Sequence, residues 1–291
     1  MSIERRLFLV GVPRSGTTLL QSLLAAHSEI TSFTESHLLS RHFSLLPIVG
    51  RPVLRSDLGA RVRGFLRENG LEVEQAEAWA EPFDRLGGLG RELRTEAALR
   101  EVVALFDRLC RERGSRTWLE KTPRHLRFVP ATEDALDPDL RRTVETIHLI
   151  RRPLETVASL HLAARDWPEP YSLEECVARW NEDVAFTLEQ LDRPRQHLVL
   201  YEELCERPEA TLRSLLDALG LAWQSALLEE FASQAKGLVL AEESWKDDVA
   251  RPLEASSRSV EKLSPARRAE IEESVDHGLY ERAYDRATAH S

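Results

Sequence analysis

Near its start the chain reads Arg6-Leu-Phe-Leu-Val-Gly11-Val-Pro-Arg14-Ser15-Gly16-Thr17-Thr18-Leu-Leu-Gln-Ser-Leu-Leu-Ala-Ala-His27, and this stretch decides the fold. The apolar run 7–10 predicts a short buried strand, and leucines at helical spacing over 19–24 predict a helix. A loop with Gly11 and Gly16 at its ends joins them. Glycine lets the backbone approach an anion, and the first N–H groups of a helix point toward it. The stretch therefore predicts a phosphate-binding loop, with a turn that binds nothing as the alternative.

The glycine spacing equals that of the loop in ATP-binding proteins, but the residues that follow differ. Those loops place a lysine after the second glycine to reach the terminal phosphates, and then a Ser or Thr that binds Mg²⁺. Here Thr17 takes the place of the lysine, and Arg14 is the only cation in the loop. The loop therefore fits a phosphate group but lacks the lysine that phosphoryl transfer from ATP uses.

At these residues the chain resembles the sulfotransferases that use 3′-phosphoadenosine-5′-phosphosulfate (PAPS). The resemblance is greatest to the branch with a Pro-Arg-Ser-Gly-Thr-Thr loop, which includes the tyrosylprotein sulfotransferases and many bacterial enzymes. In that family the loop binds the 5′-phosphosulfate end of the donor. The resemblance implies that role here for five residues, Arg14, Ser15, Gly16, Thr17 and Thr18.

The residues after a second short predicted strand, 30–33, hold the candidate general base. Aligned without gaps from the loop, Glu35 falls where the tyrosylprotein branch has its catalytic glutamate, so the resemblance implies that Glu35 takes the proton of an acceptor hydroxyl. The other interpretation is structural: Thr34 or Ser36 caps a helix, and Glu35 sits favourably in its first turn. His37 is the second candidate base, because imidazole titrates near neutral pH.

A second candidate cation follows the strand predicted at 117–120. Lys121 would lie at the carboxyl end of a parallel strand, the edge of an open α/β sheet where ligands bind. It also matches a lysine of the family pattern, which implies that it neutralises charge on the bridging oxygen as the sulfuryl group leaves. A solvated surface lysine is the alternative. His125 is expected to be a capping or substrate-side residue.

The strand predicted at 143–150 ends in two arginines, and a helix begins at Pro153. Arginine at a strand end, with Ser159 on the helix that follows, suits recognition of a phosphate monoester. A kinase strand would often end in Asp to hold Mg²⁺. The resemblance identifies Arg151 and Ser159, eight residues apart, as the 3′-phosphate site of the donor. Two surface arginines before a helix are the alternative.

Two further donor contacts are implied by resemblance toward the end of the chain. Tyr201 follows the strand predicted within 197–204 and would contact the nucleotide, although packing of a tyrosine at a sheet edge is an equal account. A Ser-Trp-Lys stretch ending at Lys246 resembles the family's loop over the adenine and the 3′-phosphate. Ser244 and Arg251 are alternatives to Lys246.

The pattern of strands alternating with helices predicts a three-layer α/β fold, a parallel sheet with helices on both faces. The resemblance narrows it to the sulfotransferase variant of the phosphate-loop fold. We expect a single domain over 1–291, with a helical acceptor-side region at about 44–115 where Trp79 and Phe83 line a pocket or fill the core. Helices are predicted at 58–66, 93–109, 173–191, 208–219, 225–235 and 265–279.

The net charge and the cysteines indicate which partners and which cellular compartment suit the protein. A formal net charge of −10 argues against nonspecific binding to nucleic acid or anionic membranes. Cys110, Cys176 and Cys205 are scattered, without metal-ligand spacing, which fits a reducing cytoplasm. No apolar run approaches a membrane span, and the first strand begins too near Met1 to leave room for a signal peptide. We therefore expect a cytoplasmic, bacterial protein.

The resemblance predicts an enzyme that moves a sulfuryl group from PAPS to an acceptor hydroxyl, releasing adenosine 3′,5′-bisphosphate (PAP) without a metal. We expect the acceptor to be a small molecule or natural product, because His37 stands where the tyrosylprotein branch has arginine. One alternative is an ATP-dependent kinase, which would need a lysine at position 17 and an acidic strand end. The other is a nucleotide-binding protein without catalytic activity.

Overall fold

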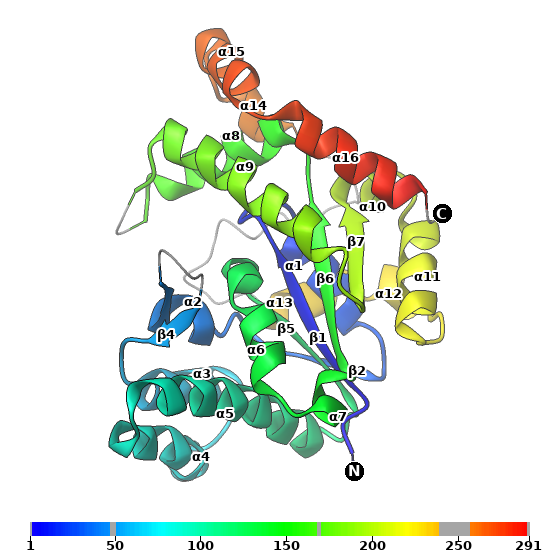
Figure 1. The fold of residues 1–291 in the computed structure, drawn as a ribbon. Helices are drawn as coiled ribbons and strands as arrows, with labels where there is room; N and C mark the ends of the chain where they lie inside the picture. The colour runs from blue at the N-terminus through cyan, green and yellow to red at the C-terminus, as the bar shows by residue number, and fades with distance from the viewer. Residues whose placement is uncertain (1, 47–50, 168–169, 239–256, 290–291) are drawn as a thin grey trace. The chain divides into compact units, whose positions relative to one another are not determined.

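The computed structural model describes residues 2–46, 51–167, 170–238 and 257–289 (Figure 1). Two compact units make up the chain. The first contains residues 1–8 and 28–144, and the second contains residues 9–27 and 145–291. The chain therefore passes from one unit to the other three times.

A five-stranded sheet has the order β2-β5-β1-β6-β7. Its strands are β1 (Arg5–Gly11), β2 (Ile30–Ser32), β5 (Thr117–Lys121), β6 (Val144–Ile150) and β7 (Gln196–Leu200). Strand β2 runs parallel to β5 with Ile30 opposite Thr117, and β6 runs parallel to β7 with Thr146 opposite Gln196. A parallel sheet with helices around it confirms the predicted fold class.

The first unit surrounds β2 and β5 with helices and one hairpin. Its other elements are α2 (Leu38–His42), β3 (Phe43–Leu45), β4 (Pro52–Leu54), α3 (Gly59–Glu68), α4 (Val73–Arg85), η1 (Leu86–Gly88), α5 (Arg91–Glu112), η2 (Pro123–Arg127), α6 (Val129–Ala135) and α7 (Pro138–Arg141). Its core is aromatic: Phe106 stacks on Phe33 and packs against Trp118. Trp79 and Phe83 are both buried in α4, which favours a core role over a pocket lining.

The second unit places ten helices around β6 and β7 within the part of the chain that the structure describes. These are α1 (Thr17–Ala25), α8 (Pro153–Ala164), α9 (Leu173–Gln190), α10 (Tyr201–Glu206), α11 (Pro208–Leu219), α12 (Ala226–Glu229), α13 (Phe231–Leu238), α14 (Arg258–Glu261), α15 (Pro265–Ser274) and α16 (His277–Thr288). Helix α16 packs against β7 and α9 (Figure 1).

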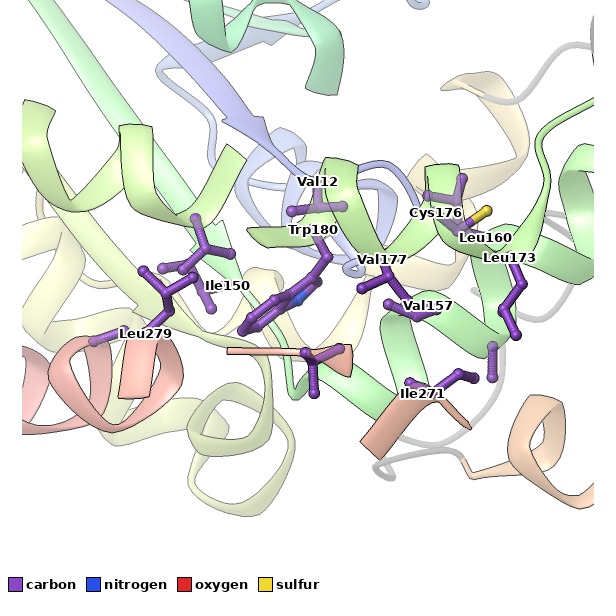
Figure 2. Packing of buried hydrophobic residues seen from close by; sticks show 14 of the residues in the cluster. Val12, Ile150, Val157, Leu160, Leu173, Cys176, Val177, Trp180, Ile271 and Leu279 are labelled. Carbon is purple, nitrogen blue, oxygen red and sulfur yellow. The ribbon is translucent and has the colours of Figure 1, made fainter. Parts of the chain in front are cut away.

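One apolar cluster in the second unit positions the two predicted anion-binding segments. Figure 2 shows Val12 of the loop, Ile150 at the end of β6, Val157 of α8 and Trp180 of α9 among its members. Removing the apolar surface of these side chains from water is favourable by about 25 cal/mol per Å². The loop after β1 and the arginine after β6 therefore rest on the same packed base.

Several elements differ from the prediction. The helix predicted at 225–235 is divided into α12 and α13. The helix predicted at 265–279 is interrupted, because Val275 is extended and buried in the core and the Asp276 N–H donates to Asn181 Oδ1 at 2.9 Å. Helix α16 then runs to Thr288, nine residues beyond the predicted end of that helix at 279. The region 44–115, predicted as helical, also contains the antiparallel pair β3–β4.

Candidate active site

The loop after β1, residues 11–16, depends on glycine at both ends. Gly11 has a φ of 155° and Gly16 a φ of 99°. A Cβ atom on Gly11 would lie 2.4 Å from the Leu149 carbonyl oxygen, and one on Gly16 would lie 2.4 Å from Cδ2 of Tyr201. Both distances are far below van der Waals contact, so only glycine fits. Gly16 is also the N-cap of α1 and has no side chain with which to cap the first N–H groups of that helix.

Ser15 carries a polar atom that points to a ligand. Its side chain is fully buried, and its Oγ has no hydrogen-bond partner among the described residues. Buried polar groups are nearly always hydrogen-bonded, so an unsatisfied hydroxyl beside two glycines and a helix N-terminus fits an anion that donates no proton of its own. The loop therefore fits the phosphosulfate group that the sequence predicts for it.

The structure brings together the predicted loop arginine and the predicted 3′-phosphate residues. Arg14, which adopts a left-handed φ of 75°, donates from Nε to Ser159 Oγ at 3.3 Å. Arg151 donates from Nη1 to the Arg14 carbonyl at 3.4 Å, and its guanidinium lies 4.4 Å from the ring centroid of Tyr201. Four of the residues predicted to bind the donor thus form one contiguous group in the second unit.

Buried side chains hold Arg151 in place, and sequence reasoning missed their role. Trp180 Nε1 donates to the Arg151 carbonyl at 3.2 Å. Glu202 accepts the Arg152 N–H at 3.0 Å, and the Tyr280 hydroxyl donates to the same carboxylate at 2.8 Å. The backbone around the arginine is therefore fixed from α9, α10 and α16. The buried face of α9, where Trp180 lies, was the signal available in the sequence.

Burial raises the pKa of Tyr201 to about 12, although the neighbouring Arg151 lowers it. The phenol therefore stays protonated at neutral pH and presents a hydroxyl rather than a charge. Its ring covers Gly16 on one side and the guanidinium of Arg151 on another. Both explanations offered by the sequence, packing at the sheet edge and contact with a nucleotide, are compatible with this position.

The first unit pairs Glu35 with Lys121. Glu35 lies in a turn of residues 34–37, here called the Glu35 turn, which joins β2 to α2. Lys121 is the last residue of β5, and since β2 and β5 run parallel, both side chains leave the same end of the strands. Lys121 Nζ donates to Glu35 Oε1, and the lysine side chain is only 1% exposed. Lys121 is therefore buried in an ion pair, and the alternative of a solvated lysine is wrong.

His37 lies beside the same carboxylate, with Nε2 3.4 Å from Glu35 Oε2. Burial lowers the pKa of His37 to about 3, against the opposing effect of Glu35 and with a further contribution from Arg41. The imidazole is therefore neutral at physiological pH and a weak proton acceptor. This favours Glu35 over His37 as the base.

His125 is fully buried. Its Nδ1 lies 3.0 Å from Glu120 Oε2, and its Nε2 accepts the Leu39 N–H at 3.2 Å. The capping interpretation of His125 thus fits, with the helix start of α2 as the group that it caps. Glu120 received no role from the sequence, where it appeared only as the last residue of a predicted strand.

The comparisons with known proteins agree with this geometry. The sequence model of the sulfotransferase family matches residues 6–225 of the chain. The chain belongs to the sulfotransferase family. Protein-tyrosine sulfotransferase 1 of Danio rerio is 27% identical over 272 residues, which cover 88% of this sulfotransferase and 66% of the relative. Nodulation protein NoeE of Sinorhizobium fredii is 29% identical over 236 residues, which cover 73% and 49%.

Solved structures show the same fold. This sulfotransferase superposes on the sulfotransferase domain from the Synechococcus PCC 7002 olefin synthase with a TM-score of 0.61, covering 94% of this chain and 95% of that one at 19% identity. The sulfotransferase domain from the curacin biosynthetic pathway gives a TM-score of 0.57, covering 95% and 99%, also at 19% identity. This sulfotransferase spans between about half and two thirds of the length of the curated relatives named above.

Some expectations for this sulfotransferase fall on other parts of the chain. Lys246 and its alternatives Ser244 and Arg251 lie outside the described residues. Within the described ranges, no three His, Cys, Asp or Glu side chains are grouped to hold a metal ion. None of the helices described here is both long enough and apolar enough to cross a bilayer.

Proposed function

We propose that the protein moves a sulfuryl group from PAPS to the hydroxyl of an acceptor and releases PAP, with residues 1–291 acting as one catalytic domain. PAPS supplies a sulfuryl group attached to a phosphate that leaves readily. One observation carries the proposal: Arg14, Arg151 and Ser159 converge beside a glycine loop whose buried Ser15 hydroxyl has no hydrogen-bond partner in the part of the chain that the structure describes. Such a group can bind a nucleotide with phosphate at two positions.

The donor contacts divide by chemistry. Ser15, Thr17 and Thr18 offer hydroxyl and backbone N–H donors at the start of α1, which suits the 5′-phosphosulfate. Arg151 and Ser159 offer a guanidinium and a hydroxyl, which suit the 3′-phosphate. Arg14 contacts Ser159 and can contribute charge to either anion. A requirement for the 3′-phosphate would separate PAPS from ATP.

Glu35 is the proposed base. As the acceptor oxygen bonds to sulfur and the bond to the bridging oxygen breaks, the hydroxyl proton passes to the Glu35 carboxylate. Lys121 carries the positive charge that offsets negative charge developing on the bridging oxygen. The low pKa of His37, about 3, supports Glu35 over His37 in this role.

For the acceptor we propose a small molecule or natural product, because a neutral His37 stands where the tyrosylprotein branch has arginine. For location we propose a bacterial cytoplasm, which suits three free, buried cysteines. A screen of cell extracts with sulfur-labelled PAPS, followed by mass analysis of the labelled product, would identify the acceptor. The proposal for a small molecule fails if the labelled product is a protein.

Two measurements test the reaction. Calorimetry should find PAP bound at least tenfold more tightly than ATP, which corresponds to about 1.4 kcal/mol; a preference for ATP would refute the donor assignment. Glu35→Gln should abolish transfer to a neutral alcohol while largely sparing 4-nitrophenol, because a large share of that phenol is already ionised at slightly alkaline pH and then needs no base. The control Glu74→Gln changes an exposed glutamate of the same unit and should behave as wild type. Equal loss on both acceptors would refute the assignment of Glu35 as base.

A further inference from the structure

The start of α2 is capped in an unusual way. A helix leaves its first N–H groups without intrahelical partners, and side chains or water must satisfy them. Here the N–H groups of residues 37, 38 and 39 reach Thr122 Oγ1 at 3.4 Å, Ser36 Oγ at 3.4 Å and His125 Nε2 at 3.2 Å. Three consecutive donors are therefore met by three different side chains.

All three capping side chains donate in turn to one carboxylate, that of Glu120. Ser36 Oγ and Thr122 Oγ1 donate to Oε1 at 2.9 Å and 2.6 Å, and His125 Nδ1 donates to Oε2 at 3.0 Å. All four side chains are fully buried. Burial pushes the pKa of Glu120 upward, but His125 and the hydrogen bonds from the three donors outweigh it, and the pKa lies below its usual value. Glu120 is therefore an ionised carboxylate in the interior. Together with Ser36, Thr122 and His125 it is here called the hub.

The hydrogen bonds also fix the tautomer of His125. A backbone N–H can only donate, so Nε2 of His125 must accept from Leu39, and Nδ1 must carry the proton that faces Glu120. The Glu120 carboxylate thus accepts three hydrogen bonds and faces no other acceptor among these three side chains. A carboxylate satisfies all three, whereas the amide of glutamine would set its NH₂ group against at least one of them.

Two residues of the hub are neighbours in sequence of the proposed base and its lysine partner. Ser36 follows Glu35 in the chain, and Glu120 precedes Lys121, so two neighbouring residues of the Glu35 turn contact two neighbouring residues of β5. Arg61 adds a third restraint, because its Nη2 and Nε donate to the carbonyls of Glu35 at 3.2 Å and Ser36 at 3.0 Å. The Glu35 turn is therefore linked to Glu120 through the Ser36 hydroxyl and, by way of Thr122, through the His37 N–H. Its carbonyls are held by Arg61.

We propose that Glu120 is a positioning residue for the transfer reaction: acting through Ser36, Thr122 and His125, it fixes the turn that presents Glu35. This inference rests on the proposed function only where it names Glu35 as the base. A misplacement of a catalytic group by about 1 Å can cost about a hundredfold in rate. Loosening the hub should therefore lower the rate of transfer without weakening the binding of PAP, because the loop, Arg151 and Ser159 that are proposed to bind its phosphates belong to the second unit.

Matched threonine variants provide the test. Thr122→Val removes a hydroxyl that links Glu120 to the His37 N–H, with little change in volume, and Thr122→Ser keeps it. The control Thr132→Val makes the same change at a fully buried threonine of the same unit, whose hydroxyl donates only within its own segment, to the Phe128 carbonyl. We expect Thr122→Val to lose about tenfold to a hundredfold in kcat on benzyl alcohol. The other two variants should stay within about threefold of wild type.

Two readouts separate positioning from a merely structural role. Thr122→Val should retain its rate on 4-nitrophenol, which needs no base, and should bind PAP with unchanged affinity. Amide hydrogen exchange at residues 37–39 should become faster in Thr122→Val and in Glu120→Gln but not in Thr132→Val. This second readout needs neither donor nor acceptor.

The outcomes are distinct. Unchanged exchange at residues 37–39 in both hub variants would overturn the proposal, as would an equal loss of rate on the two acceptors or a wild-type rate on benzyl alcohol. If wild-type protein bound no PAP, the proposed function would fail instead, while faster exchange in the hub variants would still establish Glu120 as the residue that holds the turn.

Discussion

Replacing Gly16 by alanine tests whether the loop, Tyr201 and Arg151 form one packed assembly. Gly16 has a φ of 99°, and its added methyl group would meet Cδ2 and Cε2 of Tyr201 at 2.4 Å and 2.5 Å. The same ring also contacts Arg151, whose guanidinium lies 4.4 Å from its centroid, so a shift of the ring would disturb both contacts. Gly70→Ala is the matched control, since Gly70 has a φ of 88° but nothing within 4 Å of its added Cβ.

The two variants share the backbone cost and differ in the clash. A left-handed conformation costs a residue with a Cβ about 1–2 kcal/mol, and we expect Gly70→Ala to lose that much. Carbon atoms pack at about 3.5–4.0 Å, so in Gly16→Ala the ring or the loop must shift by more than about 1 Å. Overpacking of this kind adds about 1–3 kcal/mol. Gly16→Ala should therefore lose about 2–5 kcal/mol in total.

Urea unfolding at neutral pH, followed by circular dichroism, measures both variants, and calorimetry measures their affinity for PAP. We expect Gly16→Ala to be the less stable and to bind PAP at least about tenfold more weakly, because the anion-binding loop moves with the ring. Gly70→Ala should bind PAP as wild type does. If the two variants lost equal stability, the contact between Gly16 and Tyr201 would not be the constraint inferred from the structure.

Three further predictions concern charges. Lys121→Met should cost about 3–5 kcal/mol in unfolding free energy, because the Glu35 carboxylate, only 11% exposed, would lose the ammonium that it contacts. Adding Glu35→Gln should recover most of the loss, and a stable single variant would contradict this. Burial lowers the pKa of His148 from 6.5 to about 4, so as the pH falls the unfolded chain binds this proton before the folded chain does. The contribution of His148 to the free energy of unfolding is therefore fully present above pH 6.5 and falls by about 3 kcal/mol as the pH drops to 4. In urea unfolding, the free energy of unfolding should decrease less between pH 7 and pH 5 in His148→Gln than in wild type. Arg151→Gln should weaken PAP binding about tenfold to a hundredfold in calorimetry, whereas Arg152→Gln should stay within about threefold, and equal effects would remove the special role of Arg151.

Where local signals are strong, the sequence predicts the fold well. Helix α11 spans Pro208–Leu219 as predicted, because proline suits its first position and Gly220 adopts the left-handed φ of 64° that ends it. The interruption between α15 and α16 was not predictable, because it depends on a contact with Asn181 far away in the chain. The β3–β4 pair was missed for a similar reason: β4 packs against α5.

Some residues of the candidate site could likewise be predicted from local sequence, and others could not. The loop and Arg151 were predictable because each belongs to a short motif, and Lys121 could be placed at a strand end. Glu120 was missed because a charged residue within a strand suggests solvent, and its three donors come from two separate segments. The available signal was a carboxylate directly after the apolar pair Trp118 and Leu119, followed closely by a hydroxyl at Thr122 and an imidazole at His125.

The way the chain passes between its two units has an evolutionary consequence. Residues 28–144 form an uninterrupted piece that carries Glu35, Glu120 and Lys121, whereas the loop and Arg151 lie in the other unit. A single recombination event with two crossovers can therefore replace the acid–base chemistry and the proposed acceptor region as one cassette. Because the loop and Arg151, the proposed contacts with both ends of the donor, lie outside the cassette, a new acceptor region can be acquired while these contacts are kept.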